Sequence, residues 1–258
     1  MDHNANGKKL TTNPEHNIEV FQSIEELNKA AAEYIITVSN EAIIERGKFT
    51  IVLSGGDTPQ RLYALLSEKP YREQINWNRT FIFWGDERCV PLNDKRNNAY
   101  QAKLILLDKI DIPLLNIHSI PVDLPPVVAA SNYEKDLKVF FENDPVHFDI
   151  ILLGLGENGH TASLFPGTKV IHEHAEGIRA VFVQEEKMFR ITMTAPLINK
   201  ATHILFLVTG EKKADILGKI LNSSAPLHDK YPAQLIKSVH GDLLWFADQE
   251  AASLIKQF

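Results

Sequence analysis

The sequence predicts an α/β fold in which a mostly parallel sheet carries helices on both faces. Short apolar runs rich in β-branched residues alternate with amphipathic helical segments along the chain, and such alternation is typical of parallel sheets. The run at residues 148–153 is almost continuously apolar and glycine-bounded, as expected for a strand buried on both faces. We therefore expect a single domain at residues 18–258, preceded by a flexible polar tail at residues 1–17.

The first long helix has clear end signals. Ser23 is a candidate N-cap, Glu26 completes a capping box, and apolar residues at helical spacing continue to a stop near Gly47. Further helices are expected from residue 59, at residues 97–109, from residue 126, from residue 196, and at residues 211–221 and 248–257. Strands are expected at residues 49–53, 80–84, 117–120, 148–153, 177–183, 189–194, 203–208 and 243–246.

The composition excludes several classes of protein. The formal net charge of −6 argues against a nucleic-acid-binding protein. No apolar run approaches the ~20 residues of a membrane span, and the polar N-terminal residues lack the apolar core of a signal peptide. A single cysteine, Cys89, excludes an internal disulfide and fits a reducing compartment. We expect a cytoplasmic enzyme without a metal, because no HExxH, CxxC or acidic metal cluster is present.

Four of the expected strands end in clusters of polar residues and glycine. The carboxyl ends of parallel strands lie at one edge of a sheet, where open α/β folds bind ligands. We therefore expect these clusters to converge on one ligand. They are Ser54-Gly55-Gly56-Asp57-Thr58, Asp86-Glu87-Arg88, Asn158-Gly159-His160 and Thr209-Gly210-Glu211-Lys212-Lys213.

The first cluster is a candidate phosphate site. Free N–H groups and the positive end of the helix dipole attract an anion there, and the Ser54 and Thr58 hydroxyls can add hydrogen bonds. A tight turn in which Thr58 caps the helix explains the same residues equally well. A nucleotide P-loop is excluded, because no Gly-Lys-Ser/Thr follows.

His160 is a candidate general base, presented where we expect a helix to start. The preceding residues 154–159 match G-x-G-x-x-G, but the pattern lies mid-chain and the expected acidic strand end is not evident, so we expect no nicotinamide or flavin. An imidazole is near neutral at cytoplasmic pH and can accept a proton. The alternative is a surface or capping histidine, which its place among glycines at a strand end disfavours.

Three cationic residues are candidates for anion binding. Arg88 either pairs with Asp86 or Glu87 or binds an anionic oxygen of the substrate. Arg190 lies within a strand and needs an anionic partner, for which a phosphate or a carboxylate would serve. Lys213 opens a helix, a poor place for a cation unless an anion is near.

Other polar residues are weaker candidates. Ser163 lacks the G-x-S-x-G pattern of a serine hydrolase and is expected to help start a helix. We expect Cys89 to be a core residue. His172 and His174 lack a third metal ligand and are expected at the surface.

Six motifs together resemble one protein family. SGGDTP, FWGDERCVP, GLGENGHTASLFPGT, FRITMT, LVTGEKKA and YPAQL, in this order, resemble the 6-phosphogluconolactonase family, part of a wider group with glucosamine-6-phosphate deaminase and sugar-phosphate isomerases. The resemblance begins near Asn17, and GHTASLFP is its most specific part. It implies a Rossmann-like three-layer fold. It also implies that the protein hydrolyses 6-phospho-D-glucono-1,5-lactone to 6-phosphogluconate, the second step of the oxidative pentose phosphate pathway. This reaction needs no cofactor.

The resemblance also implies roles for individual residues. His160 corresponds to a base that activates water, and Arg88 to an arginine that orients the substrate or stabilises developing negative charge. The Ser54-Gly55-Gly56 loop, Arg190 and Lys213 correspond to positions associated with the sugar phosphate. The full set of expected substrate-binding residues is Ser54, Gly55, Gly56, Thr58, Asp86, Asn158, Arg190 and Lys213.

One residue departs from the common family pattern. Many members have Asp-Gly-His where this chain has Asn158-Gly159-His160. An asparagine can accept a hydrogen bond from the imidazole or the substrate, but it cannot raise the basicity of the histidine by charge. The role of the carboxylate is therefore absent here or supplied by Glu157 or Asp86.

Two other functions stay open from the sequence. A glucosamine-6-phosphate deaminase or sugar-phosphate isomerase needs a carboxylate after Gly-His, commonly within Asn-Glu-Pro, and this chain continues SLFP instead. A non-catalytic sugar-phosphate sensor has no need of His160 and Arg88. We expect a sugar-phosphate lactone as the small-molecule partner, and a monomer or weak homo-oligomer.

Overall fold

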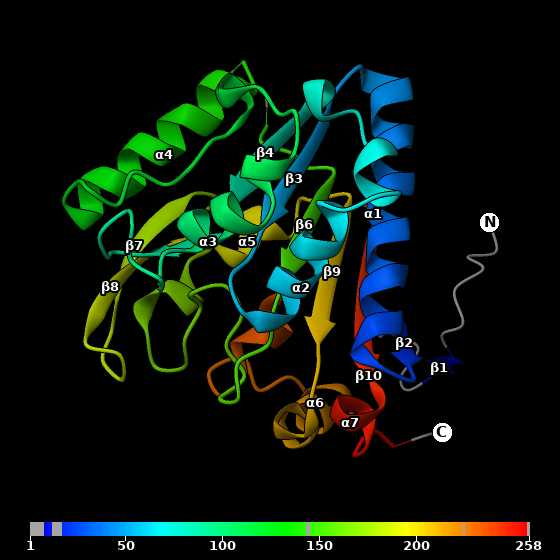
Figure 1. Cartoon of the computed structure of the whole chain (residues 1–258). Helices are drawn as coiled ribbons and strands as arrows, with labels where there is room; N and C mark the ends of the chain where they lie inside the picture. The colour runs from blue at the N-terminus through cyan, green and yellow to red at the C-terminus, as the bar shows by residue number, and fades with distance from the viewer. Residues whose placement is uncertain (1–7, 12–16, 143–144, 224, 257–258) are drawn as a thin grey trace.

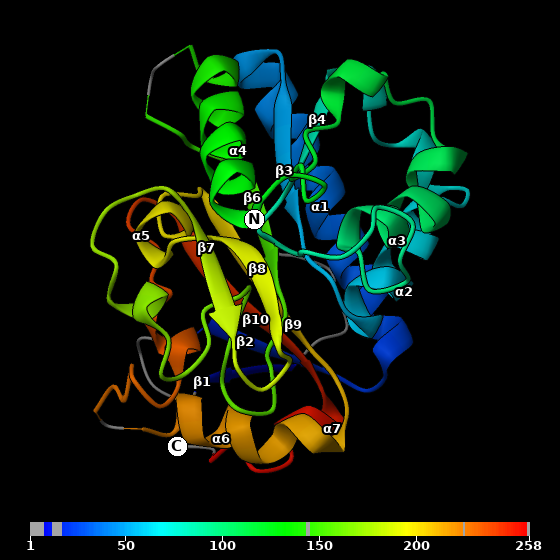
Figure 2. The ribbon, with the colours of Figure 1, turned by 90° about the vertical axis from the view of Figure 1, so that its left-hand side faces the viewer.

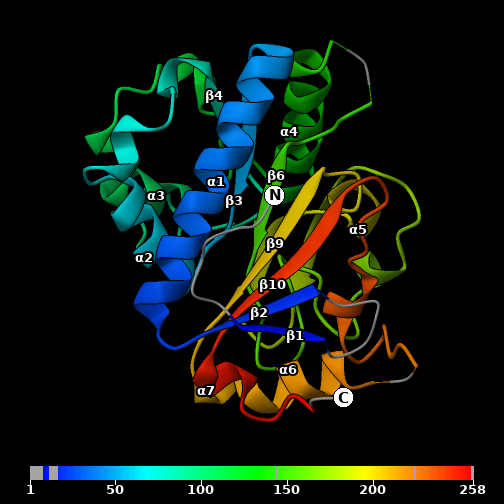
Figure 3. The ribbon, with the colours of Figure 1, turned by 90° about the vertical axis from the view of Figure 1, so that its right-hand side faces the viewer.

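The computed structural model describes residues 8–11, 17–142, 145–223 and 225–256, and its centre is a large sheet. The strands of this sheet are β1 (Lys8–Thr11), β2 (Asn17–Phe21), β3 (Phe49–Leu53), β4 (Thr80–Trp84), β6 (Ile150–Leu153), β9 (His203–Val208) and β10 (Asp242–Asp248). They lie in the order β1-β2-β10-β9-β6-β3-β4. All neighbours pair in parallel except β1, which is antiparallel to β2 at one edge (Figure 3).

Helices cover both faces of the main sheet, as predicted. Helix α1 (Ile24–Arg46) packs across β2, β3 and β10, with α2 (Asp57–Leu66) beside it. Helix α4 (Pro126–Phe140) lies on the opposite face (Figures 1 and 2). The remaining helices are α3 (Asn98–Ile105), α5 (Ala195–Ile198), α6 (Ala214–Leu221) and α7 (Gln249–Ala252). Within the described ranges, no helix combines the length and apolarity needed to span a bilayer.

Seven short 3₁₀ turns complete the described secondary structure. They are Tyr71–Glu73, Trp77–Arg79, Leu107–Lys109, Leu114–Asn116, Lys169–His172, Glu211–Lys213 and Pro232–Leu235.

A second, antiparallel sheet lies over the face that carries α4. It consists of β5 (Asp86–Arg88), β8 (Met188–Met193) and β7 (Ile178–Val183), in that order. The sequence predicted β7 and β8 as members of the mostly parallel sheet, and this was wrong. Only a short turn joins β7 to β8, and a parallel pair would need a crossover of a dozen or more residues.

The end signals of α1 confirm the predicted helix. The Glu26 N–H donates to Ser23 Oγ at 3.2 Å, and Glu26 Oε2 accepts from the Gln22 N–H at 3.1 Å. At the other end, Gly47 adopts φ +72° and its N–H donates to the Ile43 carbonyl. This left-handed conformation suits glycine.

Several local predictions differ from the structure. The helix predicted at residues 97–109 is α3, which ends at Ile105, followed by the 3₁₀ turn Leu107–Lys109. Part of the predicted flexible tail, Lys8–Thr11, is strand β1, and β2 begins at Asn17; residues 1–7 and 12–16 lie outside the described ranges. Residues 117–120 contribute only one bridge, from Ile117 to Ile82. No helix starts after His160, where turns lead to the 3₁₀ turn Lys169–His172. The last helix ends at Ala252 instead of extending to Gln257, which is itself outside the described ranges.

Asp149, directly before β6, links this strand to β3 and α1 at the amino ends of the parallel strands. Its buried carboxylate accepts hydrogen bonds from the Thr50 N–H at 2.6 Å, the Thr50 hydroxyl at 2.8 Å and Arg46 at 2.7 Å.

Asp149→Asn is therefore expected to lower the free energy of unfolding by roughly 2 kcal/mol, because one of the two acceptor oxygens becomes an NH₂ donor that faces other donors. Urea denaturation measures this. Glu45→Gln is the control, since Glu45 is exposed and also pairs with Arg46; equal losses in both variants would contradict the prediction.

Candidate active site

The four polar clusters lie along one edge of the main sheet, the edge formed by the carboxyl ends of its parallel strands. They follow β3, β4, β6 and β9, which are neighbours in the order β9-β6-β3-β4. Two clusters touch directly, because the Thr58 and Thr209 hydroxyls lie 2.6 Å apart. In Figure 1 the β9 arrow ends at this edge, beside α6 and α7. The parallel sheet thus brings together residues that lie far apart in the sequence.

The loop after β6 is shaped around the His160 imidazole. A side chain at Gly156 would overlap this ring, so only glycine leaves room for it. Gly159 has φ +82°, a conformation that favours glycine. The imidazole stacks on Phe165, with 3.9 Å between ring centroids and an interplanar angle of 18°.

Asn158 determines which nitrogen of His160 carries the proton. Its Oδ1 lies 2.6 Å from His160 Nδ1 and also accepts from the His160 N–H at 3.2 Å, while its Nδ2 donates to Glu185 Oε2 at 3.4 Å. These three contacts orient the amide with its oxygen toward the imidazole. Because that oxygen can only accept, Nδ1 carries the proton and Nε2 keeps the lone pair.

His160 is unprotonated near neutral pH. Burial, together with the nearby Arg190 guanidinium, lowers the pKa of His160 to about 4, while Asp86 and Glu186 oppose this shift. Glu157 instead acts on Lys213, where it partly offsets the lowering of the lysine pKa by burial. Of the two carboxylates predicted to stand in for the missing aspartate, Asp86 is therefore the one whose charge reaches His160.

Asp86 belongs to a buried network with the His160 loop. The Ser163 hydroxyl donates to Asp86 Oδ2 at 2.5 Å, and Arg190 Nη1 lies 3.4 Å from both of these oxygens. Ser163 therefore starts no helix, contrary to the prediction. Its hydroxyl joins the β6 loop to β5, and the Arg190 guanidinium lies 5.1 Å from the Phe165 ring that stacks on His160.

Two arginines stand side by side on the small sheet. Arg88 and Arg190 are directly opposite partners in β5 and β8, so their side chains leave the same face of the sheet. Like charges in such a pair repel, and a shared or separate anion stabilises them. Arg190 has a carboxylate partner, Glu186, at 2.6 Å.

Arg88 has no carboxylate partner within the part of the chain that the structure describes. Its Nη1 donates to the Arg96 carbonyl and to Asn98 Oδ1, each at 2.8 Å, and its buried Nε has no partner there. Pairing with Asp86 or Glu87, the structural alternative, is therefore not found. An arginine with a buried, unused donor suits an anionic oxygen of a ligand.

The Glu87 carboxylate binds backbone N–H groups, so it does not pair with the Arg88 guanidinium. Its carboxylate accepts from the N–H groups of Arg88, Asn98 and Ala99, each at 2.8 Å, at the start of α3. Burial raises the pKa of Glu87 to about 7. This residue holds β5 to α3, and so places Asn98 beside Arg88.

The Ser54-Gly55-Gly56 turn leads into α2, which starts at Asp57. Gly56 has φ +109°, and a side chain at Gly55 would overlap Asn98. The Tyr63 hydroxyl accepts from the Ser54 N–H at 2.9 Å and donates to the Ser54 carbonyl at 2.8 Å. The buried Ser54 hydroxyl has no partner in the described ranges.

Thr58 and Lys213 complete this edge. Thr58 lies inside α2 and bonds Thr209, so it is not the helix cap of the alternative interpretation. Lys213 lies half-buried at the end of a 3₁₀ turn whose first carbonyl, that of Gly210, accepts from the Lys213 N–H. The Gly210 N–H donates to both oxygens of Asp248 at 3.0 Å, which ties the turn to β10.

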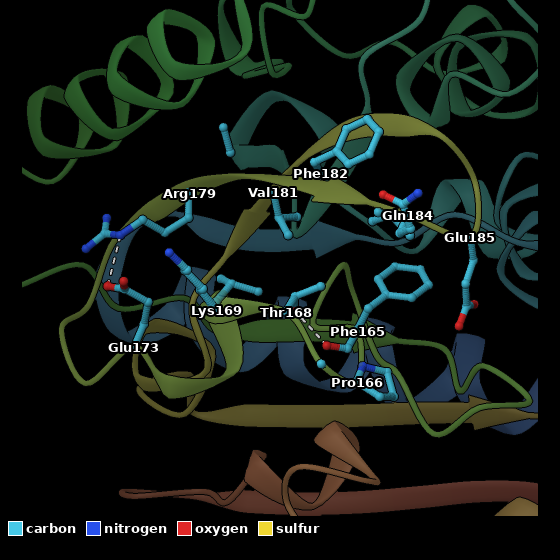
Figure 4. Close-up of a pocket in the computed structure, with 14 residues that line it drawn as sticks. Phe165, Pro166, Thr168, Lys169, Glu173, Arg179, Val181, Phe182, Gln184 and Glu185 are labelled. Atoms are coloured by element: carbon cyan, nitrogen blue, oxygen red, sulfur yellow. Dashed lines mark hydrogen bonds and ion pairs between the residues drawn. The ribbon is translucent and has the colours of Figure 1, made fainter.

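A hollow of about 450 Å³ adjoins the His160 loop without including His160. Figure 4 shows it between β7 and residues 165–173, with Phe165 and Glu185 on its wall. Arg179 and Glu173 pair at its far end, with 3.0 Å between Nε and Oε2. Phe165 stacks on His160 and Glu185 accepts from Asn158, and both line this hollow, so it is a neighbour of the candidate site.

Comparison with known proteins identifies the family of this chain. Residues 22–245 match the family described as Glucosamine-6-phosphate isomerases/6-phosphogluconolactonase. The chain belongs to this glucosamine-6-phosphate isomerase/6-phosphogluconolactonase family. The family assignment from the six sequence motifs is thereby confirmed.

Individual members of the family align along most of their length. A 6-phosphogluconolactonase of Synechocystis sp. is 39% identical, covering 93% of this chain and 98% of that relative. One of Haemophilus influenzae is 40% identical, covering 80% and 87%. The solved structure of a 6-phosphogluconolactonase from Trypanosoma cruzi superimposes with a TM-score of 0.81 at 29% identity, covering 95% and 98%.

Several residues of the site were not predicted from the sequence. Glu185, Glu186 and Asn98 enter through tertiary contacts that no local motif signals. Ser163 lies inside the most specific motif, GHTASLFP, and its place in that motif could have indicated that it belongs to the site. No group of metal-ligating side chains occurs among the residues that the structure describes.

Proposed function

We propose that this protein hydrolyses 6-phospho-D-glucono-1,5-lactone to 6-phosphogluconate, as the names of its relatives state for those proteins. The observation that carries the proposal is the neutral His160, held in one tautomer by Asn158 and lying near Arg190, which is the direct partner of Arg88 on the small sheet. A base beside anion-binding groups is what hydrolysis of an activated ester requires.

In this mechanism His160 Nε2 takes a proton from water while the water oxygen attacks the lactone carbonyl. The carbonyl oxygen becomes negative, and Arg88, with its unused Nε donor, stabilises it. The tetrahedral intermediate then collapses as the bond between the carbonyl carbon and the ring oxygen breaks. The imidazolium returns its proton to that oxygen, which leaves a hydroxyl group and a carboxylic acid.

The phosphate needs donors of its own, besides the groups that act on the reacting carbonyl. We assign it to the Ser54-Gly55-Gly56 turn with Thr58, and to Arg190 and Lys213. The turn offers N–H groups at the start of a ten-residue helix, and burial lowers the pKa of Lys213, as expected for a cation awaiting an anion. Binding there positions the ring for attack.

The site favours a lactonase over a deaminase or isomerase. Those reactions need a second acid/base group near the substrate carbons. Here the Phe165 ring covers one face of His160, and Asp86 is held by Ser163 and Arg190. A sensor would gain nothing from a base in a fixed tautomer. A cytoplasmic location and a monomeric or weakly associating state remain predictions.

An enzyme assay tests the proposal. Freshly prepared 6-phosphogluconolactone should be hydrolysed faster than its spontaneous rate, followed by coupling the product to 6-phosphogluconate dehydrogenase. Interconversion of glucosamine 6-phosphate and fructose 6-phosphate by the same preparation would contradict it.

Asn158→Asp is expected to raise the pKa of His160 by roughly one to two units, because a carboxylate beside the imidazole favours its charged form. The base is active when neutral, so in the natural protein we expect activity to be lost only as the pH falls through about 4. In the variant this loss should move to higher pH. NMR titration of the imidazole, assigned with His160→Ala, measures both midpoints; identical midpoints would contradict the assigned Asn158–His160 contact.

A further inference from the structure

The turn between β7 and β8 places a carboxylate on Arg190. Glu186 Oε2 accepts from Arg190 Nε at 2.9 Å, and both Glu186 oxygens lie 2.6 Å from Nη2. The third nitrogen, Nη1, faces Asp86 and Ser163 at 3.4 Å. All three guanidinium nitrogens therefore already have partners. An incoming phosphate that uses the same fork of donors has to replace one of these partners.

Glu186 is the partner that can leave. Its side chain is 31% exposed, whereas those of Arg190 and Asp86 are each 6% exposed. Within the described ranges the Glu186 carboxylate forms hydrogen bonds and an ion pair with Arg190 alone, while Asp86 is also held by the Ser163 hydroxyl. Releasing Glu186 into water exposes no unpaired buried group once another anion occupies Arg190.

We propose that Glu186 is an internal competitor for the substrate phosphate, holding Arg190 while the site is empty and leaving it when the phosphate binds. This inference rests on the proposed function, which assigns the phosphate to Arg190. Glu186 gives the buried guanidinium its shortest carboxylate contact, beside Arg88, which lacks a carboxylate, and so adds to the charge compensation that Asp86 gives at 3.4 Å.

Such a competitor determines which ligands bind and how fast they leave. A phosphate dianion carries more charge than a carboxylate and can displace Glu186, whereas a neutral sugar cannot. The same competition weakens binding of the phosphorylated product and so speeds its release. Glu186 is thus a specificity-determining residue that acts through Arg190.

Glu186→Gln tests this directly, because it removes the charge and keeps the shape. The KM for 6-phosphogluconolactone and the Kd for 6-phosphogluconate, measured by calorimetry, should both fall about tenfold, since the fraction of protein ready to bind rises. The kcat/KM for glucono-1,5-lactone, which lacks the phosphate, should not change. Glu186→Ala should behave in the same way.

Glu173→Gln is the matched control. Glu173 pairs with Arg179 of β7, away from Arg190, so the same loss of charge should leave KM and Kd unchanged. A Glu186→Gln protein that melts like the natural one but binds 6-phosphogluconate equally or more weakly would overturn the inference. Equal tightening in Glu173→Gln would also overturn it. If the natural protein does not hydrolyse the lactone, the proposed function fails, and the Kd comparison still decides the role of Glu186.

Discussion

His160→Ala is expected to lower kcat for 6-phosphogluconolactone by about 10²- to 10⁴-fold, the usual contribution of general base catalysis. The substrate should still bind, because Arg190, Lys213 and the Ser54 turn do not depend on the imidazole. KM should therefore change little. Steady-state kinetics, corrected for spontaneous hydrolysis of the lactone, measures the loss.

His174→Ala is the control for this experiment. His174 is exposed and lies outside the site, so its removal should leave kcat unchanged. A His160→Ala enzyme with undiminished kcat would exclude His160 as the base, whatever the natural protein hydrolyses. A large rise in KM at constant kcat would instead make His160 a binding residue.

Gly156→Ala is expected to lower kcat about 100-fold, because a displacement of a catalytic group by 1 Å can cost that much. The added methyl group would overlap the imidazole ring of His160 and push it off Phe165 and Asn158. The fold should survive, since the clash can be relieved by rotating one side chain. Activity and thermal melting should therefore respond very differently.

Gly154→Ala provides a matched control two residues away. A side chain at Gly154 would meet no atom within 4 Å, and its backbone conformation does not require glycine. Its kcat should be unchanged. If both variants lost activity equally, the loop glycines would act through backbone flexibility, and the packing of Gly156 against His160 would not explain the loss.

The buried strands were the most predictable part of the fold. Strands β3, β4 and β9 begin and end at the predicted residues, because each is a short apolar run bounded by polar residues or glycine. Helix α1 was equally predictable, since Ser23 and Gly47 mark its ends chemically. These signals are local, so no knowledge of the fold is needed to use them.

Strand β1 of the main sheet and strand β5 of the small sheet were not predictable in the same way. Strand β1 is polar and pairs only with β2, so it lacks an apolar pattern. Strand β5 has three residues, Asp86–Arg88, and is a strand only because β8 lies beside it. Both are strands because of the segment that pairs with them, β2 for β1 and the distant β8 for β5, and composition does not reveal such pairing.

The candidate site, too, was predictable only where local sequence signals exist. Its location followed from the four strand ends, because a parallel sheet places such ends together. The partner of Arg190 did not follow: the sequence left a phosphate and a carboxylate open, and in the structure a carboxylate, Glu186, occupies it. Whether a turn residue reaches inward depends on the path of the β7–β8 turn, which the FRITMT motif does not encode.

The pairing of β2 with β10 has a consequence for how the protein is made. These parallel neighbours are separated by more than 200 residues, so β2 leaves the ribosome long before its partner is synthesised. Until β10 arrives, β9 lacks one neighbour, and Asp248 cannot hold the Gly210 turn that carries Lys213. The facing edges of β2 and β9 therefore stay unpaired until residues up to Asp248 have been made, and the Lys213 turn of the site is fixed only then.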